Sequence, residues 1–357
     1  MVHVSRRWYH FGREGYSRFR RGRVCSGRPR PVPLDGAHGL HSGEGRWRKA
    51  RGYGYPPQKE GGISPYTLAA AKVAGVDEIY AVGGAQAIAA LAYGTDSIPK
   101  TAKIVGPGNA FVAAAKKIVS GDAGIDMVAG PSEGCVLADA TADATVVAAD
   151  LMAQAEHDPL ATCYLVTCDA AFAEKVQGRF AELLAASPRA EITSASLADQ
   201  GVVVVAADLE AAIDAVNVIA PEHLELHCDN AMGLLGKIEN AGAIFVGPWS
   251  SEPLGDYVAG PNHTLPTGGT AAFSNPLSVQ DFITRSSVIC YTPEGLMNDA
   301  PATQTMAQAE GLWAHALSAG LRRKMVEEDL EGFDGVDLGD INRIAWPVDL
   351  AAPKKAE

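Results

Sequence analysis

The sequence predicts an α/β fold built on parallel sheets. Short apolar runs such as Val202–Val205 alternate with longer segments of helical spacing, as expected for strands that helices cover on both faces. The chain has 357 residues, of which 47% are hydrophobic and 20% charged, so it can bury a large core in about two domains. No apolar run approaches the ~18 residues of a membrane span, so no membrane partner is expected.

The first half of the pattern runs from Ser64 to Val119. Two glycine turns, Gly83–Gln86 and Val105–Asn109, each lead into a helix. Neither has the Gly-x-Gly-x-x-Gly spacing of a dinucleotide site, so close packing explains them as well as phosphate binding does. The predicted elements are a helix from Ser64 to Gly75 with Pro65 at its first position, a strand Glu78–Val82, and helices Ala87–Tyr93 and Ala110–Val119.

The second half repeats the alternation with stronger apolar strands. One amphipathic helix begins at Asp143, a credible N-cap, and its last turn carries Gln154 and His157. The predicted strands are Cys135–Ala138, Cys163–Val166, Gly201–Ala206, Glu225–His227 and Ala243–Val246, and the other helices are Ala171–Leu184, Leu209–Val218 and one around Glu310–Leu321.

Charge separates the beginning of the chain from the rest. Residues 1–60 hold 14 Lys and Arg against 4 Asp and Glu, although the net charge of the whole chain is −12. A basic arm can bind nucleic acid, but no nucleic-acid-binding motif accompanies this one, so no nucleic-acid partner is expected. The six cysteines are dispersed without a Cys-x-x-Cys pair, which favours reduced thiols and a cytoplasmic protein.

Three places carry side chains suited to chemistry. A spacing of three puts Gln154 and His157 on one helical face, which is half of a metal site, although such a pair is also ordinary polar surface. Glu222 and His223 lie on a loop between helix and strand, where a surface pair is the plainer interpretation. Asp256 could supply an anionic oxygen ligand.

Several motifs in order make the chain resemble one family. Ile125–Asp126, Ala129–Glu133, Asp150–Leu151 and Gln154–His157 are similar to the pattern of histidinol dehydrogenase, and the resemblance covers roughly Gly61 to Arg322. It implies oxidation of L-histidinol to L-histidine with two NAD and one zinc ion per subunit. It also implies two incomplete Rossmann-like, aldehyde-dehydrogenase-like domains and a helical C-terminal tail.

The resemblance implies a role for individual residues. The zinc ligands are Gln154, His157, Asp256 and, from the tail of the other subunit, His315, so that the active form is a homodimer. His223 is the general base and Glu222 activates water for the second oxidation. Substrate contacts fall on Ser132, Gln154, His157, His223, Asp256, His263, Glu310 and His315, and NAD contacts on Gln86 and Asn109. A helix containing both Glu310 and His315 would separate them by roughly 140°, so their pairing rests on the resemblance alone.

The resemblance also sets the expected domain boundaries. Residues 1–57 are expected to lie outside the family pattern and to be mostly disordered, because the N-terminal half-domain of the family is not legible there. The NAD-side domain spans 58–132, the domain with zinc and catalytic residues 133–277, the dimerisation tail 278–322 and a weakly ordered acidic extension 323–357. Two alternatives stay open: a related polyol or amino-alcohol dehydrogenase, and a zinc-binding dimeric fragment without turnover.

Overall fold

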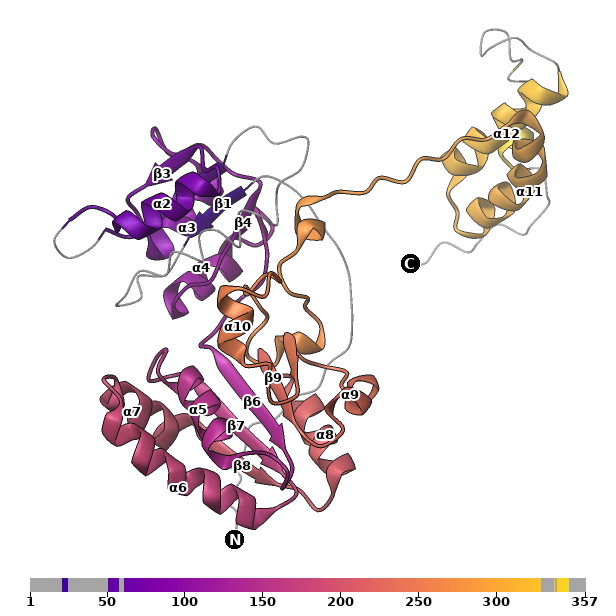
Figure 1. Cartoon of the computed structure of the whole chain (residues 1–357). Coiled ribbons are helices and arrows are strands. Elements are labelled where there is room, and N and C mark those ends of the chain that lie inside the picture. Colours follow the sequence, from indigo (N-terminus) through magenta and orange to yellow (C-terminus); the bar gives the residue numbers. More distant parts are fainter. Residues whose placement is uncertain (1–20, 25–50, 58–60, 329–336, 338, 347–357) are drawn as a thin grey trace, which may run out of the picture. The chain divides into compact units, whose positions relative to one another are not determined.

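The computed structural model describes residues 21–24, 51–57, 61–328, 337 and 339–346 (Figure 1). Contacts divide the chain into two compact units, residues 1–285 and 286–357. The first unit holds two five-stranded sheets in which every strand pair is parallel, and the second is helical. The predicted α/β class with parallel sheets and a helical C-terminal region is confirmed.

The first sheet has the strand order β3-β2-β1-β4-β5. Its apolar core lies between the sheet and helices α3 and α4, and it includes Ile88, Leu91 and Ile104. The elements are β1 (Arg21–Val24), β2 (Arg51–Gly54), α2 (Pro65–Val73), β3 (Glu78–Tyr80), α3 (Gly84–Tyr93), β4 (Lys103–Val105), α4 (Ala110–Val119) and β5 (Gly124–Ile125).

Two strands of this sheet fall inside the segment that was expected to be mostly disordered. β1 occupies the middle of the sheet and β2 pairs with it in parallel, and Tyr53, on β2, is fully buried. The boundary at residue 57 is therefore too late for Arg51–Tyr55, and Arg21–Val24 is also part of the fold. The other residues of 1–50 lie outside the described residues.

The second sheet has the order β10-β9-β6-β7-β8. The chain winds outward from β6 through β7 to β8 and then returns through α8 to β9 on the other side of β6. The elements are β6 (Glu133–Ala138), α5 (Ala144–Ala155), β7 (Thr162–Thr167), α6 (Ala170–Ala186), α7 (Ala190–Gln200), β8 (Gly201–Val205), α8 (Leu209–Ile219), β9 (His223–His227), α9 (Ala231–Leu234), β10 (Ala243–Val246) and α10 (Glu252–Tyr257).

Alternate residues of these strands pack into two separate hydrophobic cores, one on each face of the sheet. Leu137 and Leu224 pack toward α8 on one face, whereas Val136 and Leu165 pack toward α5 and α6 on the other (Figure 1). Period-2 alternation in a sheet covered on both sides requires apolar residues on both faces. β9 departs from this rule on the face toward α5, where it carries His223, Glu225 and His227.

The second unit consists of α11 (Pro293–Ala309), α12 (Trp313–Glu327) and α13 (Ile341–Ala345). The helix expected around Glu310–Leu321 is found as α12, but it begins only at Trp313, because α11 ends before Glu310 and Gly311 has a φ of 73°. α12 runs to Glu327, a few residues past the expected end of the tail at residue 322. Ala345 of α13 is buried against α11 and α12. Most of the expected extension beyond Glu328 lies outside the described residues.

Candidate active site

Helix α5 is capped by side chains at both of its ends. The Asp143 Oδ1 atom accepts from the backbone N–H groups of Thr145 and Val146, which confirms it as the N-cap. At the other end, Arg189 donates from Nε and Nη2 to the Glu156 carbonyl at 2.9 and 2.7 Å. α5 therefore holds Gln154 in its last turn and His157 just beyond its end.

The acid–imidazole pair Glu222–His223 lies just after a residue whose backbone has the left-handed helical conformation. Ala220, at the end of α8, has a φ of 47°, a conformation that costs a residue with a Cβ about 1 kcal/mol or more. His223 is the first residue of β9 and pairs in register with Gly134 of β6, so both residues of the pair are buried rather than set on an open loop. They lie at the amino ends of the strands, whereas ligands of open α/β sheets usually bind beyond the carboxyl ends.

His223 is oriented by two oxygen atoms. Its Nδ1 lies 3.0 Å from Gln154 Oε1 and 3.2 Å from the Glu133 carbonyl oxygen. Because both partners are acceptors, Nδ1 carries the proton and Nε2 carries the free lone pair. The pKa of His223 is lowered to about 3, chiefly by burial and partly by the nearby His157 and His263, against the opposing effect of the hydrogen bond to Glu133, so the imidazole is neutral at physiological pH.

The Glu222 carboxylate lies near the same nitrogen of His223. Its Oε2 accepts from the Glu133 backbone N–H at 2.9 Å and lies 4.0 Å from His223 Nδ1. Glu133 is itself an acid at the site, and burial raises its pKa to about 7 although backbone N–H groups, including that of Gly268, oppose the shift. The sequence did not single out Glu133 as a site residue, because no local pattern shows that its carboxyl group will be buried.

A second group of ligand atoms lies beside His223. His157, Glu252 and Asp256 each offer one atom, and these atoms lie within 4.8 Å of one another. Asp256 Oδ1 is 3.9 Å from His223 Nε2. Burial, together with the charges of Asp256 and Glu225, raises the pKa of Glu252 to about 8. The structure thus brings the predicted ligands His157 and Asp256 together and adds Glu252, which the sequence analysis missed.

Polar atoms without hydrogen-bond partners converge on the same place. Among the described residues, Gln154 Nε2 and His223 Nε2, on side chains that contact each other, are buried and lack such a partner. Buried polar atoms are nearly always satisfied, so a cluster of exceptions indicates a place where a polar ligand binds. Nitrogen and carboxylate oxygen donors within a few ångströms of each other suit a zinc-like divalent cation.

The remaining predicted residues fall into three places. Ser132 immediately precedes β6, and His263 lies close enough to His223 to affect its pKa. Gln86 lies in the first turn of α3, and Asn109 caps α4 by accepting from Phe111 N and Val112 N, so both follow strands of the first sheet. Glu310 and His315 are exposed in the second unit, which is described by itself.

A surface depression of about 610 Å³ does not coincide with any of these residues. It is lined by Lys100–Ala102 and Ser120–Gly124, which precede or begin β4 and β5. It therefore lies at the opposite end of the first sheet from Gln86 and Asn109. We assign no role to it, because its lining brings no reactive side chains together.

Comparison with known proteins places this geometry in a family. The family model for histidinol dehydrogenase matches residues 53–323. The histidinol dehydrogenase of Bacillus cereus is 53% identical over 266 residues, covering 74% of this chain and 62% of its own. That of Lactiplantibacillus plantarum is 55% identical over 261 residues, covering 73% and 61%. This chain thus spans less than two thirds of the length of these relatives.

A solved structure gives the same result. The crystal structure of histidinol dehydrogenase from Elizabethkingia anophelis superposes with a TM-score of 0.81 at 37% identity, over 86% of this chain and 71% of that one. In the described part of this chain, no helix is both long and apolar enough to cross a bilayer. The match from residue 53 onward agrees with the burial of Tyr53, and on these grounds the chain belongs to the histidinol dehydrogenase family.

Proposed function

We propose that this chain oxidises L-histidinol to L-histidine through L-histidinal, with two NAD as hydride acceptors and one zinc ion per subunit. The observation that carries the proposal is the group His157, Glu252 and Asp256 next to the buried pair Glu222–His223. Family membership supports it, although the chain spans only 62% of the length of the relative from Bacillus cereus.

The residues present fit zinc. His157 and Asp256 would hold the ion, with Gln154 beside them and His315 of a second subunit completing the set. When bound, zinc supplies a Lewis acid that holds the amino-imidazole substrate in place. Glu252 lies within 4.8 Å of the same atoms and would contribute negative charge to the site. Ser132, His263 and, from the second subunit, Glu310 would contact the substrate.

His223 would act as the general base. Because Gln154 and the Glu133 carbonyl hold its Nδ1 proton, its Nε2 is the atom available to take the proton of the substrate hydroxyl. A neutral imidazole is the form that can accept this proton. Glu222 would activate the water that adds to the bound aldehyde. Its carboxylate is suited to this role because it is a base that is buried next to His223, with Oε2 4.0 Å from the imidazole Nδ1.

Gln86 and Asn109 would contact NAD, which accepts the hydride in each oxidation. Both side chains lie just beyond strands of the first sheet, at the carboxyl ends where α/β sheets bind nucleotides. The Asn109 oxygen caps α4, which leaves its amide N–H groups for a ligand. We also propose a homodimer and a cytoplasmic location; the described cysteines are all free, as in a reducing compartment.

The proposal is tested by incubating the purified chain with L-histidinol, NAD and zinc. Two NADH formed for each histidine is the expected result. Zinc bound without NADH would reject the dehydrogenase and leave the zinc-binding dimeric fragment. Oxidation of other amino alcohols at equal rates would favour the related dehydrogenase instead.

Metal content tests the ligand set separately. His157→Asn should lower the zinc content of the purified protein, whereas Glu156→Gln, a change at the exposed neighbouring residue, should not. Undiminished zinc in the His157→Asn variant would reject the proposed ligands.

A further inference from the structure

One buried strand face carries polar residues where apolar ones are expected. On β9, His223, Glu225 and His227 are 4%, 3% and 5% exposed, and they share the face toward α5. Leu224 and Leu226, between them, are fully buried in the core under α8. Buried acids and imidazoles are costly unless they are paired, so each position on this face needs a partner.

The partners come from two helices at matching intervals. On α5, Asp150 and Gln154 are four residues apart, and on α10, Glu252 and Asp256 are four residues apart. Four helical residues advance about 6 Å and two strand residues about 6.6 Å, so both helices can stay in step with alternate residues of β9. Gln154 and Asp256 meet His223 at one level, and Asp150 and Glu252 meet Glu225 at the next.

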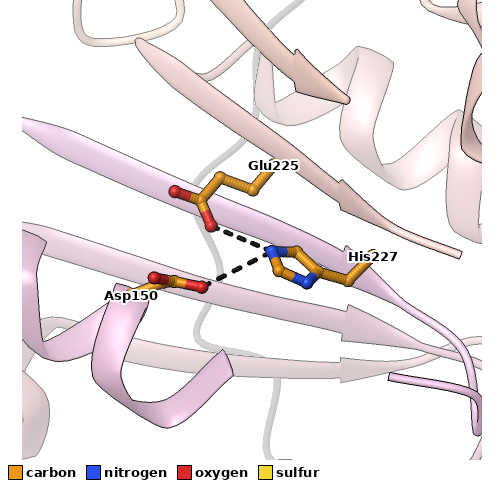
Figure 2. A group of neighbouring side chains, drawn as sticks. All are labelled: Asp150, Glu225 and His227. Carbon is orange, nitrogen blue, oxygen red and sulfur yellow. Dashed lines mark hydrogen bonds and ion pairs between the residues drawn. The ribbon is translucent and has the colours of Figure 1, made fainter. Parts of the chain in front are cut away.

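The deeper level is a group of three side chains, Asp150, Glu225 and His227, which we call the buried triad (Figure 2). His227 Nε2 lies 3.1 Å from Glu225 Oε2 and 3.4 Å from Asp150 Oδ2. The two carboxylates therefore face a single imidazole nitrogen, which holds the Glu225 side chain in one orientation.

The second oxygen of Glu225 reaches α10. Glu225 Oε1 accepts from the backbone N–H of Glu252 at 2.6 Å, and Glu252 is the first residue of that helix. The N-cap residue, Ser251, makes no side-chain capping hydrogen bond. Glu225 thus satisfies, from a neighbouring strand, a donor that a helix normally satisfies with its own N-cap.

We propose that Glu225, held by His227 and Asp150, is a positioning residue that sets where α10 presents Asp256 to the metal site. This inference rests on the proposed function, since it assigns Glu225 a purpose only if His157 and Asp256 bind zinc. α10 is six residues long and has no side-chain cap of its own at its N-terminus, so its first turn moves when the Glu225 oxygen is removed. Such supporting contacts typically change metal affinity by 10- to 100-fold.

The test compares zinc affinity in three variants of the full chain, by competition with a chromogenic chelator. Glu225→Leu removes the acceptor and should raise the zinc dissociation constant about tenfold or more. Glu225→Gln keeps an oxygen for the Glu252 N–H and should stay within about threefold of the wild type. Leu226→Ala, on the opposite face of the same strand, disturbs the core but should leave zinc affinity unchanged.

Three results would overturn the positioning role. The first is unchanged affinity in Glu225→Leu, and the second is an equal loss in Glu225→Gln, which would assign the effect to charge. The third is a second equivalent of zinc that Asp150→Asn abolishes, which would make the buried triad a metal site itself. If Glu225→Leu does not fold, Glu225→Asp withdraws the oxygen by one methylene, and wild-type affinity there would equally overturn the inference.

The proposed function fails in a different way. If the wild type binds no zinc, or if His157→Asn binds it as tightly, the metal site itself is rejected. Zinc that depends on His157 but not on Glu225 rejects the positioning role alone.

Discussion

A buried ion pair beneath the proposed NAD-binding turn gives a prediction that does not depend on catalysis. Lys116 of α4 is 1% exposed, and its ammonium group pairs with Asp126, whose side chain is fully buried. Lys116 Nζ also donates to the Gly106 carbonyl at 3.0 Å, while Asp126 accepts from Gly106 N and Met127 N, each at 2.7 Å. Together the two side chains fix both polar groups of Gly106.

The Lys116→Met variant keeps the length of the side chain and removes its charge. It leaves Asp126 as a buried carboxylate without a counter-ion and Gly106 O without its donor. Removing one partner of a buried pair costs about 3–5 kcal/mol, so the free energy of unfolding should fall by that amount. Lys117→Met makes the same change at the exposed next residue and should alter the free energy of unfolding by less than about 0.5 kcal/mol.

Urea denaturation followed by circular dichroism measures both values, and isothermal titration with NAD reports whether the turn keeps its shape. The double variant Lys116→Met/Asp126→Asn should be about 1–3 kcal/mol more stable than the sum of its single changes predicts, because it removes the unpaired charge. A loss for Lys116→Met no larger than that for Lys117→Met would refute the reasoning. It would mean that the carboxylate is neutralised or hydrated without the lysine.

Three further outcomes are expected. Gly134→Ala should lower zinc affinity about tenfold, because the new Cβ would lie 2.8 Å from Gln154 Cγ, whereas Gly178→Ala, where nothing lies within 4 Å, should not. His223→Asn should reduce NADH formation on the order of 10²–10⁴-fold while zinc content is kept; wild-type turnover would exclude it as the base. Burial raises the pKa of Glu133 from 4.5 to about 7, so its ionisation between these pH values should lower the stability of the zinc-free protein by about 3 kcal/mol. Urea denaturation should therefore find the fall in stability over this pH range about 3 kcal/mol smaller in Glu133→Gln than in the wild type.

The second sheet was predictable because its strands have a strong pattern. The predicted strands Cys135–Ala138 and Gly201–Ala206 differ from β6 and β8 by no more than two residues at either end. β1 and β2 were missed because Arg21–Val24 and Arg51–Gly54 carry charge and glycine in place of an apolar period. Their strand state depends on pairing with neighbours that are distant in sequence, which local patterns do not report.

The sequence predicted some residues of the candidate site and missed others. Resemblance identified His157, Asp256 and the Glu222–His223 pair, and the structure brings these together. Glu252 and Glu133 were missed, because nothing local marks a carboxylate that tertiary packing will bury. One feature of the sequence could have indicated the buried triad. Glu225 and His227 alternate with leucines in a strand that lies between buried neighbours, and this pattern predicts that the two polar side chains have buried partners.

The matched spacing of the three elements explains why the site lies at the amino ends of the second sheet. α5 returns antiparallel to β6, so its last turn arrives where β9 begins, and Gln154 reaches His223 there. A shift of one residue in α5 would rotate its side chains by about 100° and move them about 1.5 Å, which would carry Asp150 and Gln154 off the face of β9. A shift of one residue in β9 would turn His223 and Glu225 into the apolar core under α8. The capped ends of α5 therefore matter for the chemistry as well as for the fold, because they help to hold a register in which the buried acids and imidazoles meet.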